Sequence, residues 1–396
     1  MALMTGSPPH PADQVHLGNW RQAPACRWAF NHVREIVPSA PVLAPRDGER
    51  PLQIDTEAFD SLPFVDATGT HTTGREWAER MAVDSVVLLH GDRVRLDWYA
   101  DGQSPHVPHI LMSVSKSVLG LLAGAVLAET NTAVDTPITE VLPELRNSAW
   151  AGATLQHALD MQVSIDFDED YLATGGAIIA YRKAQGWNPA DAADRPSDLR
   201  QFFPSLQSDG GTHGKHFHYV SPNTDMMGWA LERIAGARYS DLLSELLWQP
   251  MGAADDAYIT VDRLGAARAA GGLCTTARDL ARLGVLVAEG GAVGTRQVLP
   301  EHWVANTLGG GSHNAFTTGN FHDKFPGESV SYRHFCYWNA EPQPFLFGIG
   351  IHGQAWVIDP ARALVLVVQS SHGDPQPASA MAHVMALFRQ LRDTLG

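Results

Sequence analysis

Apolar runs near both ends of the chain have the length and composition of β-strands. They are rich in Val, Ile, Leu and aromatic residues and cover residues 85–90, 93–100, 345–350, 354–358 and 363–370. The first two runs are joined by Gly91-Asp92, a two-residue hairpin signal. Two distant segments therefore supply strands, which we expect to form one sheet.

Between these segments the apolar residues recur at helical spacing. The helices expected there cover residues 154–161, 197–203, 225–235 and 239–248. A helix capped by Thr275 or Thr276 and a last amphipathic helix over residues 381–395 follow. This order predicts an α/β protein whose sheet domain comprises residues 1–155 and 270–396, with a helical domain inserted over residues 156–269.

The most apolar of the expected helices covers residues 114–128, where Lys116 is the only charged side chain. A helix that is apolar all round is a buried helix. A buried lysine is costly unless it is paired or gives up its proton. Burial favours the neutral amine, and a neutral amine is a base. The sequence therefore predicts a reactive amine at the start of this helix.

Composition narrows the class of protein further. The chain has 396 residues, of which 44% are hydrophobic and 18% charged, as in globular proteins. The net charge of −15 argues against nucleic acid and anionic membrane surfaces as partners. The N-terminal residues lack the pattern of a signal peptide, and the three cysteines have no disulfide or zinc spacing. We expect a cytoplasmic protein with a small-molecule substrate, and leave a homodimer open.

Ser113 and Lys116 form a Ser-x-x-Lys pattern at the start of the apolar helix. Residues three apart on a helix share a face, so the hydroxyl and the amine can touch. The free N–H groups of a helix start suit a developing oxyanion. The alternative is a Ser113 that only caps the helix and a Lys116 that extends to the surface.

Two later segments add candidate chemistry. Tyr219 precedes the helix expected at 225–235, and a phenol near an amine can ferry a proton. The segment Gly348-Ile-Gly-Ile-His-Gly-Gln354 places glycines in an apolar strand, which often marks close approach of a ligand or backbone. Taken alone, the stretch around Tyr219 favours a core residue next to a helix start.

Together, Ser113-Val-Ser-Lys116, Tyr219-Val-Ser221 and Gly348-Ile-Gly350 resemble the three motifs of the serine β-lactamase and DD-peptidase superfamily. More narrowly, the chain resembles the 6-aminohexanoate-dimer hydrolases and the family VIII carboxylesterases. The segments that carry this narrower resemblance are Trp28-Ala-Phe30, Leu111–Ser117, Asp160-Met-Gln162, Ser164-Ile-Asp166, Glu169-Asp-Tyr171, Asn223-Thr-Asp225, Ala277–Arg282 and Gly348–Gln354.

The resemblance implies a β-lactamase-like fold, with an antiparallel sheet flanked by helices and an inserted all-α domain. It implies Ser113 as nucleophile, Lys116 as base and Tyr219 as proton relay, with the N–H groups of Ser113 and Ile351 as oxyanion hole. It also implies Tyr171 over the bound amide, and no metal or organic cofactor. The further residues expected to bind substrate are Arg182, Trp187, Ser221, Ala270 and Tyr337, with Gln376 at another variable position.

The activity expected is hydrolysis, through an acyl-enzyme, of amide bonds in linear aliphatic oligomers, accompanied by esterase activity. A carboxylesterase for short acyl esters, a lactam hydrolase and a silent binding protein on the same fold are the alternatives. Ser221 in place of Asn and the absence of a Lys-Thr-Gly motif depart from the β-lactamases. Arg182 stands where the related hydrolases can carry a carboxylate for a substrate ammonium group.

Other polar clusters have competing interpretations. His213, His216 and His218 could bind a metal, but they lack carboxylate or Cys companions and favour a segment at the pocket rim or facing solvent. The acidic run at residues 166–170 favours a solvated loop over a cation site. Trp187 and Tyr337 could equally form the wall of an apolar acyl pocket or belong to the core.

Overall fold

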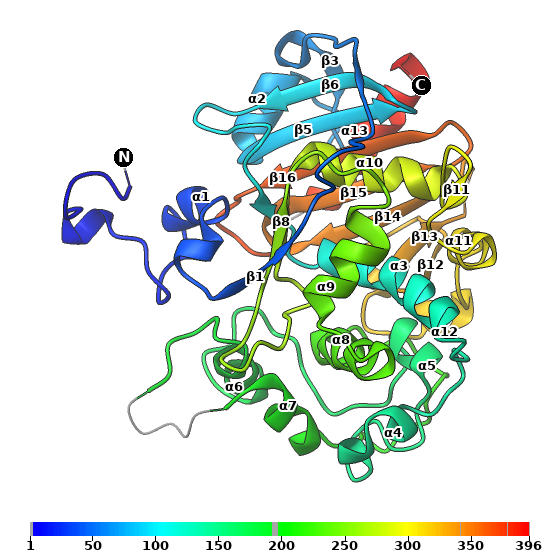
Figure 1. Ribbon diagram of the computed structural model, residues 1–396. Coiled ribbons are helices and arrows are strands. Elements are labelled where there is room, and N and C mark those ends of the chain that lie inside the picture. The colour runs from blue at the N-terminus through cyan, green and yellow to red at the C-terminus, as the bar shows by residue number, and fades with distance from the viewer. Residues whose placement is uncertain (1–2, 192–196, 341, 378, 396) are drawn as a thin grey trace.

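A computed structural model describes residues 3–191, 197–340, 342–377 and 379–395. Figure 1 shows an upper half built around a large sheet and a lower half made mainly of helices. The helices are α1 (Ala25–Ala29), α2 (Gly74–Arg80), α3 (Val114–Glu129), α4 (Ile138–Val141), α5 (Leu155–Leu159), α6 (Ala177–Ala184), α7 (Leu199–Phe202), α8 (Ser221–Ala235), α9 (Tyr239–Leu243), α10 (Ala277–Ala288), α11 (Glu301–Leu308), α12 (His313–Thr317) and α13 (Ala380–Leu395).

Within the described residues the largest sheet has eight strands, from both ends of the chain. In spatial order they are β12 (Val330–Arg333), β13 (Cys336–Asn339), β14 (Phe345–Gly350), β15 (Gln354–Asp359), β16 (Leu364–Ser370), β5 (Val83–His90), β6 (Arg93–Tyr99) and β2 (Gln53–Ile54). All neighbours are antiparallel except the edge pair β2 and β6. The predicted single sheet from two distant segments is confirmed where β16 pairs with β5.

The other strands of the described residues form smaller sheets. One has four strands, β1 (Ser39–Val42), β8 (Ala257–Thr260), β9 (Leu273–Thr275) and β7 (His109–Ile110). The others pair β3 (Pro63–Val65) with β4 (His71–Thr73) and β10 (Ala292–Val293) with β11 (Arg296–Gln297). The division at residues 156 and 269 stays a prediction, and β8 lies inside the segment assigned there to helices.

Helices cover both faces of the large sheet. Successive side chains of a strand point to opposite faces, so one strand can contact a helix on each side. On β14, a Cβ added at Gly348 would lie 2.8 Å from Ser117 Oγ of α3, whereas the Phe345 ring packs on Phe388 of α13. Helix α10 lies over β15, β16 and β5 (Figure 1).

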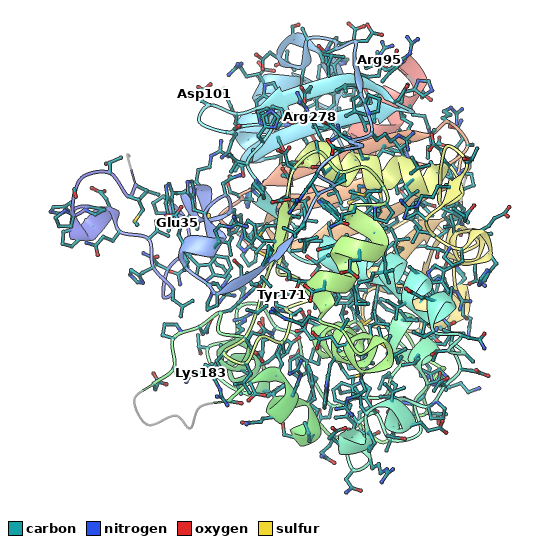
Figure 2. All side chains as sticks on the ribbon, viewed as in Figure 1. Glu35, Arg95, Asp101, Tyr171, Lys183 and Arg278 are labelled. Atoms are coloured by element: carbon teal, nitrogen blue, oxygen red, sulfur yellow. The ribbon has the colours of Figure 1, made fainter. Side chains whose placement is uncertain are left out.

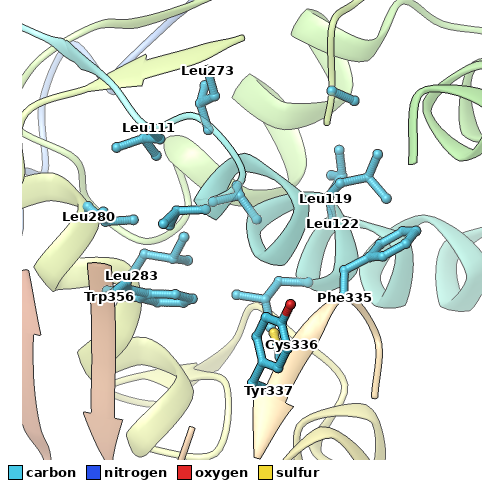
Figure 3. Packing of buried hydrophobic residues seen from close by; sticks show 14 of the residues in the cluster. Leu111, Leu119, Leu122, Leu273, Leu280, Leu283, Phe335, Cys336, Tyr337 and Trp356 are labelled. Atoms are coloured by element: carbon cyan, nitrogen blue, oxygen red, sulfur yellow. The ribbon is translucent and has the colours of Figure 1, made fainter. Parts of the chain in front are cut away.

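Helix α3 is buried as its composition predicts. All its residues from Val114 to Leu127 are buried. Figure 3 shows Leu119 and Leu122 of this helix beside Phe335, while Leu280 and Leu283 of α10 gather at Trp356 of β15. The helix therefore starts its first turn in the interior, next to the sheet.

Candidate active site

The backbone before α3 turns Ser113 toward open space. Strand β7 ends at Ile110, and Met112 adopts a left-handed conformation with φ +46°, which is unusual outside glycine. Ser113 takes the N-cap position, but its side chain makes no capping hydrogen bond. Its hydroxyl is partly exposed and faces Lys116, so the interpretation of Ser113 as a mere cap is wrong.

The Lys116 amine is buried, with 1% of the residue exposed, and does not extend to the surface. Its Nζ lies 2.8 Å from Ser113 Oγ, 3.0 Å from Ser221 Oγ and 2.9 Å from the carbonyl oxygen of Ala270. Burial lowers the pKa of Lys116 to about 7, and the positive charge of Arg268 adds to this, while the nearby carboxylates oppose it. A large fraction of the amine is therefore neutral near pH 7.

Glu169 orients the hydrogen bonds around this amine. Its carboxylate accepts from the backbone N–H and the hydroxyl of Ser221, and from the Tyr171 hydroxyl at 3.0 Å. Since the Ser221 proton points to Glu169, the Ser221 oxygen is left to accept from Lys116. A neutral amine that donates to Ser221 Oγ and to the Ala270 carbonyl directs its lone pair at Ser113.

The ring of Tyr219 lies against the Lys116 amine. Its ring centroid is 4.9 Å from Lys116 Nζ, it is 3% exposed, and it stacks on Phe321 at 4.5 Å. Its backbone N–H donates to Asn320 Oδ1 at 2.9 Å. Burial raises the pKa of the Tyr219 hydroxyl, and the charge of Glu169 adds to this. The phenol therefore keeps its proton and can donate it.

The end of β14 comes close to the segment that precedes the nucleophile. A Cβ added at Gly350 would lie 2.7 Å from the Leu111 carbonyl oxygen and 3.0 Å from Met112 Cβ. Only glycine allows this approach, which places Ile351 beside Ser113, where both residues line the same cavities. The Ser113 N–H donates to no described residue.

Two cavities meet at Ser113, Tyr171 and Ile351. The larger has a volume of about 400 Å³ and contains Tyr219; its mainly apolar wall includes Phe321, Phe325, Ile349, Met381 and Val384. The smaller has a volume of about 30 Å³, and its wall includes charged side chains. Figure 2 shows Tyr171 near the centre of the molecule.

Five residues expected to bind substrate line the smaller cavity: Tyr171, Arg182, Trp187, Ser221 and Ala270. Gln376 lines the larger one. Tyr337 is 2% exposed and packs behind Tyr219, with its ring stacked on Phe347 at 5.0 Å. Tyr337 is absent from the walls of both cavities, so the structure places it in the core beside the site.

The other polar clusters hold no metal-ligand set among the described residues. His213 accepts from the Ser164 N–H at 3.0 Å, and His216 Nδ1 lies 2.8 Å from Thr318 Oγ1. In the acidic run Asp166, Asp168 and Asp170 are exposed, in line with a solvated loop. Glu169 is the exception, because it turns inward.

Glu169 and a buried pair beside it are site residues to which the sequence assigned no role. Asp225 accepts from Arg268 at 2.7 Å and from the Ala270 N–H at 2.7 Å, and so fixes the carbonyl that holds Lys116. The sequence signal for Asp225 was its place in Asn223-Thr-Asp225, one turn into α8. Glu169 begins the segment Glu169-Asp-Tyr171, but nothing in that segment marks it as the carboxylate of the acidic run that turns inward.

Comparison with known proteins agrees with this geometry. The family model described as Beta-lactamase matches residues 71–390. The chain belongs to the beta-lactamase family. It is a serine hydrolase of that superfamily, and the predicted β-lactamase-like fold is confirmed.

Relatives within this family share most of the chain. A 6-aminohexanoate-dimer hydrolase of Paenarthrobacter ureafaciens is 37% identical over 365 residues, 92% of this chain and 90% of that protein. A solved structure from Bacillus anthracis, described as a candidate 6-aminohexanoate-dimer hydrolase, has a TM-score of 0.87 at 24% identity over 98% of both chains. A family VIII carboxylesterase has a TM-score of 0.59 at 14% identity, covering 80% of this chain and 94% of its own.

Among the described residues no helix is both long and apolar enough to cross a membrane. Cys26, Cys274 and Cys336 are all buried and free.

Proposed function

We propose that this protein hydrolyses amide and ester bonds through an acyl-enzyme on Ser113. The observation that carries the proposal is the buried Lys116 amine, 2.8 Å from the Ser113 hydroxyl and held there by two further contacts. A serine hydroxyl needs an adjacent base to become a nucleophile, and an amine with a pKa of about 7 is such a base at neutral pH.

In the proposed reaction Ser113 Oγ attacks the substrate carbonyl carbon while its proton passes to Lys116 Nζ. The N–H groups of Ser113 and Ile351 stabilise the negative charge that develops on the carbonyl oxygen. Tyr219 donates a proton to the leaving nitrogen or oxygen and regains one from Lys116. Water then attacks the acyl carbon while Lys116 takes its proton. The bond between the acyl carbon and Ser113 Oγ breaks, Lys116 returns the proton to Ser113 Oγ, and the carboxylic acid product leaves.

The preferred substrate is an amide in a linear aliphatic oligomer. The 400 Å³ cavity supports this choice, because its largely apolar wall suits a methylene chain and it contains the proton donor Tyr219. The name of the relative from Paenarthrobacter ureafaciens, a 6-aminohexanoate-dimer hydrolase, supports it as well. We place the enzyme in the cytoplasm because its three cysteines are free and buried.

A substrate panel tests the proposal. We expect 6-aminohexanoate dimer and p-nitrophenyl esters to be hydrolysed, and Ser113→Ala to abolish both activities while the circular dichroism spectrum and melting temperature are kept. Ester hydrolysis without amide hydrolysis would make the protein a carboxylesterase. Preferred turnover of lactams would make it a lactam hydrolase. Ligand binding without turnover of any substrate would make it a binding protein and overturn the proposal.

A further inference from the structure

The smaller cavity at Ser113 has three arginines in its wall, although the whole protein is acidic. Arg21, Arg182 and Arg268 come from the N-terminal segment, from α6 and from the loop before β9, respectively. With a volume of about 30 Å³ the cavity holds about two water molecules, or one group of carboxylate size.

The charges of these guanidinium groups are only partly balanced. Arg268 is paired with Asp225 at 2.7 Å. Arg21 and Arg182 form no ion pair with a carboxylate in the described part of the chain; Arg182 donates to the Tyr171 carbonyl oxygen at 3.1 Å and Arg21 to the Asn188 side chain. Burial and repulsion by Arg182 and Arg268 lower the pKa of Arg21 to about 9.

Glu169 is the carboxylate in the cavity wall, and its oxygens are already engaged by Ser221 and Tyr171. Glu169 and Asp225 together carry two negative charges against three guanidinium groups. With the Lys116 amine neutral, the three guanidinium groups exceed these two carboxylates by one positive charge, and the further carboxylate that acts on Arg182, that of Asp170, is exposed to solvent. A single anionic group would balance the excess charge.

Buried polar groups without a partner, most of them donors, surround the same space. Gln185 lines the cavity, is 0% exposed, and neither its Oε1 nor its Nε2 has a hydrogen-bond partner among the described residues. The Nε atoms of Arg21 and Arg268 are buried and unpartnered too. Such groups are rarely left unpaired, so they point to a polar ligand group.

Trp187 holds two of the guanidinium groups in place. Its ring centroid is 5.6 Å from Arg21 Cζ and 5.0 Å from Arg268 Cζ, and its Nε1 donates to Thr260 Oγ1 at 3.1 Å. Guanidinium groups on aromatic faces are pre-organised for a planar anion. Trp187 therefore belongs to the cavity wall rather than to the core alone.

We propose that the smaller cavity binds a carboxylate at the end of the substrate's acyl chain. This inference rests on the proposed function, in which Tyr219 delivers a proton to the leaving group. Tyr219 lines the larger cavity but not the smaller, so the leaving group occupies the larger cavity and the acyl chain points to the arginines. Among the linear aliphatic amides and esters of the proposed function, this favours those whose acyl part ends in a carboxylate, the monoamides and monoesters of short dicarboxylic acids, over those that end in an ammonium group.

Three p-nitrophenyl esters with different acyl ends test this: the monoester of adipate, the hexanoate and the 6-aminohexanoate. We expect kcat/KM for the adipate monoester to exceed that for hexanoate at least about tenfold, with the aminohexanoate lowest. The glutarate monoester, corrected for its spontaneous hydrolysis, checks whether the cavity prefers a shorter chain. Free adipate should inhibit hexanoate hydrolysis competitively, and hexylamine should not.

Variants separate this inference from the function it rests on. Arg182→Gln should lower kcat/KM for the adipate monoester much more than for hexanoate, so that the preference for adipate is lost, and Arg182→Asp should move the preference to 6-aminohexanoate. Arg200→Gln, which alters an arginine paired with Glu232 outside both cavities, is the matched control and should change nothing. Hydrolysis of hexanoate with no preference for adipate, or with the preference intact in Arg182→Gln, would overturn the inference alone. No hydrolysis of any ester would overturn the proposed function, and the inference with it.

Discussion

Lys116 must be neutral to take the Ser113 proton, and its surroundings set the pH at which this holds. Its pKa is lowered to about 7, mainly by burial, so the amine is protonated and inactive below that pH. We expect kcat/KM for p-nitrophenyl hexanoate to fall about tenfold per pH unit below about pH 7 and to level off above it. A profile that stays flat down to about pH 5.5, or that still rises near the ordinary lysine pKa, would contradict this role.

The substitution Glu169→Gln separates two effects of the Glu169 carboxylate, one on the position of the Ser221 proton and one on the pKa of Lys116. The amide offers one acceptor oxygen in place of two to the three donors that Glu169 holds, so it fixes the Ser221 proton less firmly and kcat should fall, by about tenfold or more. The negative charge of Glu169 raises the pKa of Lys116, so its loss should move the acid limb of the pH profile to lower pH. Asp168→Asn, an exposed neighbour in the same run, is the control and should leave both rate and profile unchanged. A lower rate without the shift would mean a purely structural role.

At the scale of elements, α3 lies so close to the β12–β13 turn that Gly120 has no room for a side chain. A Cβ there would lie 1.8 Å from the His334 carbonyl oxygen. Gly120→Ala should therefore lower the free energy of unfolding by about 1–3 kcal/mol, measured by urea denaturation. Gly175→Ala, with nothing within 4 Å of the added atom, is the control. Equal stability of the two variants would show that the helix shifts freely.

The elements that the sequence predicted well are those with a strong local pattern. The hairpin at Gly91, the strands of the last third, the apolar helix and the Thr276 cap all follow from residues close in the chain. Strands β12 and β13 were missed, because their polar and aromatic residues give no clear alternation. Strands β7 and β9 are too short to show a period, and they form because distant segments pair.

The same distinction applies to the site. Ser113, Lys116 and Tyr219 sit in short motifs, so the sequence could propose them. Glu169 and the three arginines of the smaller cavity come from segments far apart in the chain, and the tertiary structure alone brings them together. Tyr337 was expected at the substrate, but its aromatic neighbours hold it behind Tyr219.

At the scale of the whole molecule, nucleophile and proton donor come from different parts of the fold. Ser113 starts α3 beside the sheet, while Tyr219 precedes α8 and is held by Asn320 and Phe321. An amine must be protonated before it leaves, whereas nitrophenoxide leaves unaided. Tyr219→Phe should therefore reduce kcat/KM for amides more than for nitrophenyl esters, although both should fall.

Tyr337→Phe is the matched control for this comparison. Its ring lies behind that of Tyr219, and its hydroxyl has no hydrogen-bond partner among the described residues, so both activities should be kept. Equal losses on amides and esters in Tyr219→Phe would show that this tyrosine does not protonate the leaving group.

The most direct test of the central claim is to find where the acyl group is attached. After acid quenching of the enzyme during turnover of a p-nitrophenyl ester, peptide mass spectrometry should find the acyl mass on Ser113, and Ser113→Ala should carry none. Lys116→Ala should slow the appearance of the adduct without moving it. An acyl group on Ser115, Ser117 or any other residue, or turnover that persists in Ser113→Ala, would contradict the account.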